Sequence, residues 1–133
     1  MKTKIKYILT STIILTLFSI IISCATKPVT IPPNLSPSEF FQRAQDASEI
    51  GNYKLAMQYY LEFQKRYPDN LNKNLWAEYE IAFLYHKMGK DKKAVELLDK
   101  LIEKYNSKGT NKWPQAPKIL AEKVKENILK KKK

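Results

Sequence analysis

The sequence predicts an all-α fold, a solenoid of two helical hairpins followed by a C-terminal capping helix. One observation is an internal repeat, because Ala44 and Gly51 recur as Ala82 and Gly89, each 38 residues later. Periods of this length are typical of stacked pairs of helices. A second observation is that apolar residues recur every three or four positions through the repeats, which is the spacing of an amphipathic helix. A third is that helix start and stop signals divide the repeats into segments of helical length.

The first segment, residues 1–23, has the three parts of a secretory signal peptide. Three lysines stand within the first six positions, and residues 8–22 form an apolar stretch shorter than the roughly 20 residues of a membrane-spanning helix. The stretch ends in Ile21-Ile22-Ser23-Cys24, which resembles a bacterial lipobox. This resemblance implies cleavage before Cys24 and lipidation of its side chain with acyl chains such as palmitate. The alternative is an uncleaved anchor in which Cys24 is a buried structural residue.

Residues 24–36 form the predicted linker between the lipidated cysteine and a domain at residues 37–133. Three prolines within the linker favour an extended polyproline II conformation, so the linker is expected to act as a stalk. The domain begins at Ser36-Pro37-Ser38-Glu39, which has the spacing of a capping box with proline in the first helical position.

Each expected helix of the two hairpins carries one apolar stripe. In the first hairpin the stripes comprise Phe40, Ala44, Ala47 and Ile50, then Ala56, Tyr59, Tyr60 and Phe63. In the second hairpin they comprise Ile81, Ala82, Tyr85 and Met88, then Val95, Leu98, Leu101, Ile102 and Tyr105. Gly51 and Gly89 follow the first stripe of each hairpin, where a left-handed residue ends a helix. The small residues expected where paired helices approach most closely are Ala44, Ala56, Ala82 and Ala94.

The tail from Pro117 predicts the capping helix, which would cover the apolar end of the second hairpin as solenoids require. Its apolar face comprises Leu120, Ala121, Val124 and Ile128. The lysines at positions 130–133 either contact anionic lipid or keep the protein soluble. The chain carries a formal net charge of +11, but nucleic acid is not an expected partner of an exported lipoprotein.

The repeat positions resemble the tetratricopeptide repeat. In the first copy, five positions of that pattern are occupied by Ala44, Gly51, Ala56, Tyr60 and Pro68. The second copy keeps Ala82, Gly89 and Ala94, whereas Leu98 replaces the aromatic residue and Asn106 the proline. The resemblance implies a stack of helical hairpins that binds protein partners.

A narrower resemblance is to the BamD lipoproteins of the β-barrel assembly machinery, the BAM complex. It rests on the lipobox, the short stalk and Arg66-Tyr67-Pro68, where the first hairpin closes; extra residues after Asn70 would lengthen the connection. It implies an anchor at the periplasmic face of the outer membrane and partners such as BamA or unfolded outer-membrane proteins. That family usually has five repeats, whereas this chain has two and a terminal helix. The alternative is a cell-envelope coordinator resembling CpoB.

In the tetratricopeptide fold, the first helix of each hairpin lines the concave face. The expected groove for a partner peptide is therefore formed by Phe41, Gln45, Trp76, Tyr79, Phe83, His86 and Lys87. Aromatic residues contribute most of the binding energy at such sites. The alternative is that Trp76 and Tyr79 pack against the 70–74 connection or the stalk.

The composition leaves few means of catalysis. One cysteine, one histidine and three glycines exclude an internal disulfide, a histidine cluster for metal and a glycine-rich phosphate loop. Glu78 and Glu80 are interpreted as parts of solvated helix faces rather than as a carboxylate pair. No enzyme activity, cofactor or metal is expected.

Overall fold

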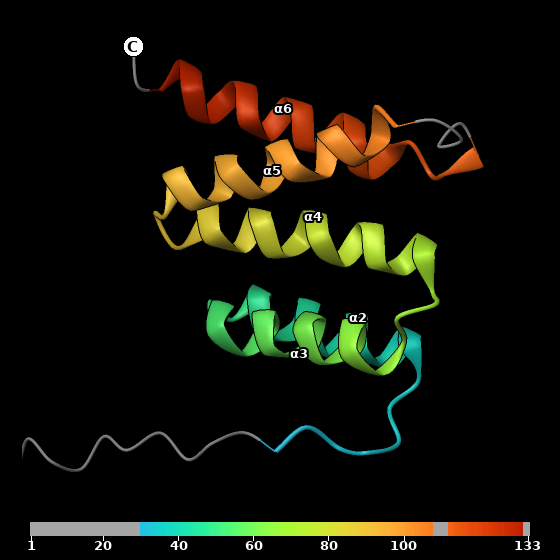
Figure 1. Ribbon diagram of the computed structural model, residues 1–133. Helices are drawn as coiled ribbons and strands as arrows, with labels where there is room; N and C mark the ends of the chain where they lie inside the picture. Colours follow the sequence, from blue (N-terminus) through green and yellow to red (C-terminus); the bar gives the residue numbers. More distant parts are fainter. Residues whose placement is uncertain (1–29, 108–111, 132–133) are drawn as a thin grey trace, which may run out of the picture. The chain divides into compact units, whose positions relative to one another are not determined.

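The computed structural model describes residues 30–107 and 112–131 of the chain. The expected signal peptide and Cys24 lie outside these residues. The described part contains five helices and no strands, which confirms the all-α prediction (Figure 1). The helices are α2 (Pro37–Glu49), α3 (Tyr53–Arg66), α4 (Leu71–Lys87), α5 (Asp91–Tyr105) and α6 (Ala116–Lys130). They form two hairpins, α2–α3 and α4–α5, with α6 packed on the second.

Each of the first three helices is capped by the side chain of the residue that comes just before it. At α2, the Ser36 backbone N–H donates to Glu39 Oε2 at 2.7 Å and the Glu39 N–H donates to Ser36 Oγ at 3.3 Å. This is the predicted capping box, and its hydrogen bonds lower the pKa of the Glu39 carboxyl. Asn52 and Asn70 accept backbone N–H groups at the starts of α3 and α4.

The two predicted glycines end the first helix of each hairpin. Gly51 has φ +77° and Gly89 has φ +73°, a left-handed conformation that a side chain would strain. After α2, the Gly51 N–H donates to Ser48 O at 3.0 Å and the Asn52 N–H donates to Ala47 O at 2.8 Å. The same pair of bonds follows α4, so both helices end in a Schellman motif.

The first hairpin and α4 share one hydrophobic core. Its buried members are Leu35, Phe40, Ala44, Ala47, Ala56, Tyr59, Tyr60, Phe63, Ala77, Ile81 and Leu84. One residue of the predicted stripe does not belong to it, because Ile50 is 80% exposed. Ile50 is the cap residue that follows the last helical residue of α2, so its side chain no longer follows the helical stripe.

The four small repeat positions Ala44, Ala56, Ala82 and Ala94 are fully buried. The expected longer connection before α4 is not found. Instead α4 has 17 residues against 13 in α2, so the extra residues lengthen the helix at its start. The added turn is held by Asn74, whose Nδ2 donates to Tyr67 O at 2.8 Å and Pro68 O at 3.0 Å.

The second core joins α4, α5 and α6. Its buried members are Leu75, Tyr79, Ala82, Ala94, Leu98, Leu101, Tyr105, Ala121 and Ile128. The face predicted for α6 thus covers the second hairpin, as expected of a capping helix.

Part of the expected stalk packs against the first hairpin. Leu35 is buried in the first core, and the compact unit begins at Ile31. Arg66 Nη1 donates to Pro32 O at 2.8 Å and to Pro33 O at 2.9 Å, while its Nε pairs with Glu62 Oε1 at 2.7 Å. The extended segment is therefore fixed to α3 from Ile31 onward. Within the described residues, no helix is both long enough and apolar enough to cross a bilayer.

Candidate functional site

A groove with two pockets runs along the first helices of the repeats. The α2–α4 pocket has a volume of about 550 Å³ and the α4–α6 pocket a volume of about 330 Å³. Phe83 of α4 lines both of them, so the two pockets meet at its ring. We refer to the two pockets together as the groove.

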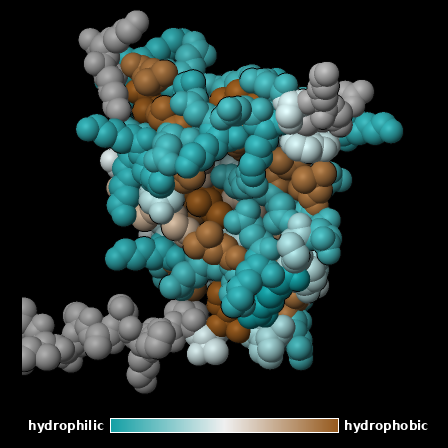
Figure 2. All heavy atoms as spheres, in the orientation of Figure 1, coloured by the Kyte–Doolittle hydropathy of each residue, from teal (hydrophilic) through white to brown (hydrophobic). Residues whose placement is uncertain are grey.

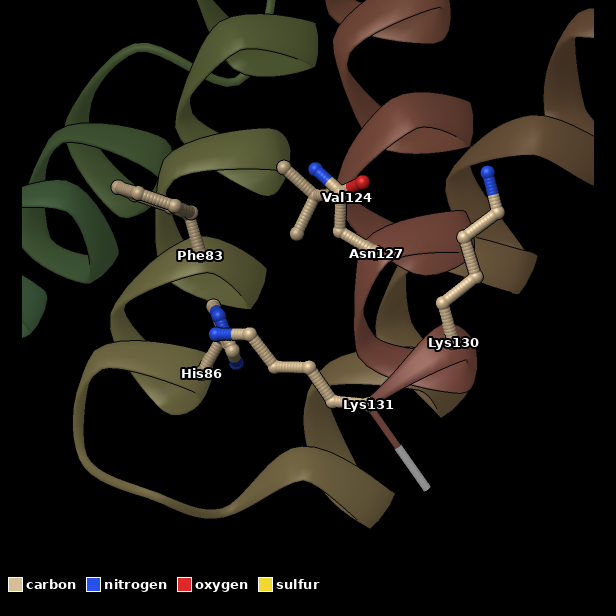
Figure 3. A pocket seen from close by; sticks show the side chains of 6 residues that line it. All are labelled: Phe83, His86, Val124, Asn127, Lys130 and Lys131. Carbon is tan, nitrogen blue, oxygen red and sulfur yellow. The ribbon is translucent and has the colours of Figure 1, made fainter. Parts of the chain in front are cut away.

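The α4–α6 pocket is basic. Its lining consists of Phe83, His86, Val124, Asn127, Lys130 and Lys131 (Figure 3). In Figure 3 the side chain of Lys131 extends toward His86. His86 Nδ1 lies 2.6 Å from Asp91 Oδ1, a contact that ties the end of α4 to the start of α5. Lys130 pairs with Glu126, whereas Lys131 has no anionic partner among the described residues.

The α2–α4 pocket is more polar and contains an acidic group. Its lining consists of Gln45, Ser48, Glu49, Tyr53, Tyr60, Glu80, Phe83, Leu84 and Lys87. Gln45, Glu49 and Lys87 are exposed, whereas Glu80 is half-buried and Tyr60 is fully buried. The pocket therefore combines aromatic walls with one carboxylate that is only partly in contact with water.

Glu80 does not lie on a solvated helix face, contrary to the interpretation from sequence. Burial raises the pKa of its carboxyl, and no hydrogen bond or ion pair offsets this effect in the part of the chain that the structure describes. Burial, together with the Glu80 charge, also raises the pKa of the Tyr60 and Tyr79 hydroxyls. Glu78 differs, because its carboxylate pairs with Lys104 Nζ at 2.6 Å.

The stability of the folded protein is expected to depend on pH through the Glu80 carboxyl. Because its pKa is higher in the folded protein than the ordinary 4.5, the folded protein binds the proton more tightly and loses stability as the pH rises above 4.5. We expect the melting temperature of Glu80→Gln, relative to wild type, to rise between pH 4 and pH 8. The control is Glu103→Gln, which removes the charge of an exposed glutamate on α5. Equal pH dependence in the wild type and Glu80→Gln would contradict a desolvated carboxylate.

The aromatic residues expected to form a groove are divided between core and groove. Tyr79 is only 7% exposed and belongs to the second core, against which Trp76 packs. The rings of Tyr79 and Phe83 stack with centroids 6.0 Å apart, and Trp76 meets Tyr79 edge-on at 6.2 Å. A groove formed by all three rings requires this face of α4 to be free of packing. This face instead packs in the second core with α6. Phe83 also packs against that core, but it is the one of the three that lines the groove.

The remaining predicted groove residues are also divided. Phe41 packs edge-on against Tyr60 at 5.1 Å and Phe63 at 5.2 Å, with Lys73 Nζ 4.7 Å from its ring centroid. It lies at the junction of helices and lines neither pocket of the groove. The predicted residues that do line the groove are Gln45, Phe83, His86 and Lys87.

Sequence reasoning missed the contribution of α6 to the groove. Val124, Asn127, Lys130 and Lys131 line it, although the expected groove included residues of the two hairpins alone. A signal was present, because Leu120 and Ala121 match Ile81 and Ala82 after 39 residues. That match makes α6 the first helix of a third partial repeat, which places it beside α4.

A second depression is less suited to a ligand. A pocket of about 280 Å³ is lined by residues of α3, α4 and α5, among them Leu61, Ile81 and Leu97. Its charged lining residues already have partners in the protein, since Lys104 pairs with Glu78 and Lys100 with Glu96. In the view of Figure 2, hydrophilic residues cover most of the surface, and hydrophobic residues form separate patches. The groove is the better candidate because Glu80 and Lys131, which have no partner within the described ranges, line it on either side of Phe83.

The residues that line the groove can bind a partner side chain. In the described ranges, no three histidine, cysteine, aspartate or glutamate side chains gather in a way that could hold a metal ion. An aromatic ring between an acidic pocket and a basic pocket can bury an apolar side chain and pair with charges on either side of it.

Comparisons with known proteins give one family match and one relative. A tetratricopeptide-repeat model matches residues 40–70 and 76–105, which cover α2–α3 and most of α4–α5. An uncharacterized protein of Treponema pallidum (strain Nichols) is 29% identical over 96 residues, which are 71% of this chain and 38% of that protein. The chain thus spans less than half the length of this relative. No solved structure matches the chain significantly. The two hairpins are thus similar to tetratricopeptide repeats over the matched residues.

Proposed function

We propose that the protein is a lipid-anchored scaffold at the periplasmic face of the outer membrane and that it takes part in assembling β-barrel proteins, as BamD does. Its partner would be a BamA-like barrel subunit or an unfolded outer-membrane protein. The observation that carries the proposal is the groove, in which Phe83 stands open between an acidic and a basic pocket.

The groove suits a segment of a partner protein rather than a small molecule. Both pockets are open, and most residues around them come from α2, α4 and α6, with Tyr53 and Tyr60 contributed by α3. A partner segment crossing these helices would bury an apolar side chain against Phe83. A carboxylate of the segment could pair with Lys131.

The anchor is tested by replacing its cysteine. Cys24→Ala should block lipidation, because the thiol is the group that accepts the lipid, and should leave an unprocessed precursor that migrates more slowly. Labelled palmitate and gel migration measure both effects, with Ser19→Ala as a control substitution in the same segment. Incorporation of the label into Cys24→Ala would contradict the proposed anchor.

The partner is tested by affinity purification of the full chain from detergent-solubilised membranes. Recovery of a BamA-like subunit or of unfolded barrel proteins would support a role in assembly. Recovery of Tol proteins or peptidoglycan synthases instead would contradict it and favour a coordinator resembling CpoB.

A further inference from the structure

Glu80 is an unexplained feature of the groove. Its carboxylate is half-buried in the wall of the α2–α4 pocket, and burial is the sole cause of its raised pKa. Removing a carboxylate from water without a donor or a cation costs free energy, so buried charges are ordinarily paired. The fold does not require this charge, because a neutral side chain would occupy the same position at lower cost.

Among the described residues, Glu80 has no cationic partner although the chain is rich in lysine and arginine. The protein has 24 lysines and arginines but 13 aspartates and glutamates, so cations are abundant. Several other acidic residues pair with them: Glu62, Glu78, Glu96, Asp99 and Glu126. Glu80 has no such partner within residues 30–107 and 112–131. Lys87 lines the same pocket but lies seven residues further along α4, about 10 Å along the helix axis.

The surroundings of Glu80 suit an external cation. The rings of Tyr60 and Phe83 line the same pocket, and aromatic faces attract lysine and arginine side chains. Leu84 adds an apolar surface along which the aliphatic stem of such a side chain can lie. The burial that makes an unpaired carboxylate costly also strengthens its attraction to a cation, because the local dielectric constant is lower than in water.

We propose that Glu80 binds a lysine or arginine side chain of the partner segment held in the groove. This inference rests on the proposed function, since it concerns the same groove. The basic α4–α6 pocket lies on the other side of Phe83, so one pocket of the groove has an acidic residue and the other has basic residues. A segment with a basic residue on one side of an apolar residue and an acidic residue on the other is bound in one orientation.

The test begins with a library of random linear peptides displayed on phage and selected against the full chain in detergent. The selected peptide that binds most tightly is then synthesised with blocked ends, with and without replacement of its basic residue by glutamine. Both peptides are titrated against the wild type, Glu80→Gln and Glu103→Gln, the last being a control for loss of one negative charge.

We expect the selected peptides to share a lysine or arginine close to an apolar residue. Replacing that basic residue should weaken binding to the wild type and to Glu103→Gln by about tenfold or more, but should have little effect on binding to Glu80→Gln. Because the peptide itself is changed, the comparison on the wild type does not depend on the folding of Glu80→Gln and shows whether the basic residue contributes to binding.

Two results would overturn the inference: selected peptides without a basic residue, or equal binding of the charged peptide to the wild type and Glu80→Gln. Titration of Phe83→Ala then shows which proposal has failed. Loss of binding by Phe83→Ala would leave the groove as the site and remove the role of Glu80 alone. Unchanged binding by both variants, or no peptide selected by the wild type, would contradict the groove as well.

Discussion

Replacing Phe40 with alanine is expected to lower the free energy of unfolding by about 3–5 kcal/mol, a large part of the stability of a domain of this size. Phe40 is fully buried, and its ring meets those of Tyr59, Phe63 and Tyr67 edge-on at centroid distances of 6.5, 6.1 and 6.1 Å. The guanidinium carbon of Arg66 lies 5.2 Å from the same ring. Removing the ring leaves a cavity between α2 and α3 that backbone movement cannot fill. Urea denaturation followed by circular dichroism measures the loss.

Ile50→Ala is the matched control for this substitution. Both residues belong to the apolar stripe predicted for the first helix, but Ile50 is 80% exposed. Its replacement should change the free energy of unfolding by no more than about 0.5 kcal/mol. Equal losses in Phe40→Ala and Ile50→Ala would contradict the packing of the first hairpin and the end of α2 before Gly51.

Phe83→Ala is expected to weaken partner binding by about thirtyfold, because truncation of a central apolar anchor typically costs about 2 kcal/mol or more. Phe83 is the one aromatic residue that lines both pockets of the groove. The measurement is titration of the partner recovered from membranes, or of a selected peptide, against the full chain. The melting temperature of the variant is measured in parallel.

The matched control is Ile119→Ala, which removes an apolar side chain that is 60% exposed on α6 and lines neither pocket. It should bind partner as the wild type does. Normal binding by a well-folded Phe83→Ala would show that Phe83 serves packing and that the partner binds elsewhere. Trp76→Ala is a poor substitute for this test, because Trp76 lines neither pocket of the groove.

The features that the sequence predicts correctly depend on short stretches of chain. The capping box needs a spacing of three positions, from Ser36 to Glu39, and the left-handed ends at Gly51 and Gly89 depend on a single residue each. The repeat pattern adds the pairing of helices, because small residues recur where the helices meet. These signals are local or periodic, so they can be read without knowledge of the tertiary structure.

The features that the sequence does not predict depend on contacts between distant segments. Trp76, Tyr79 and Phe83 share a helical face, and all three belong to the second core or pack against it, but of the three only Phe83 lines the groove. The periodicity of the sequence places all three residues on one helical face, but it cannot show which of them line the groove. Glu80 has the sequence environment of a surface residue, and its burial follows from the pocket between α2 and α4.

The start of the domain shows the same limit. Proline content predicts an extended segment before Ser36, and the chain is indeed free of helix at residues 30–36. The attachment of that segment depends on Arg66 and Tyr67, more than 30 positions away, which donate to the carbonyls of Pro32, Pro33 and Leu35. Composition alone carries no information about such contacts.

The central claim is that partners bind in the groove formed by α2, α4 and α6. Site-specific photo-crosslinking in intact cells tests it most directly, with a photoreactive residue at Gln45 or at Gln58. Both are exposed glutamines, but Gln45 lines the groove on α2, whereas Gln58 lies on α3 and lines no pocket of the groove. Position 45 should give a discrete crosslinked partner, identified by mass spectrometry, and position 58 should give none. The same partner crosslinked from position 58 and not from position 45 would contradict binding in the groove.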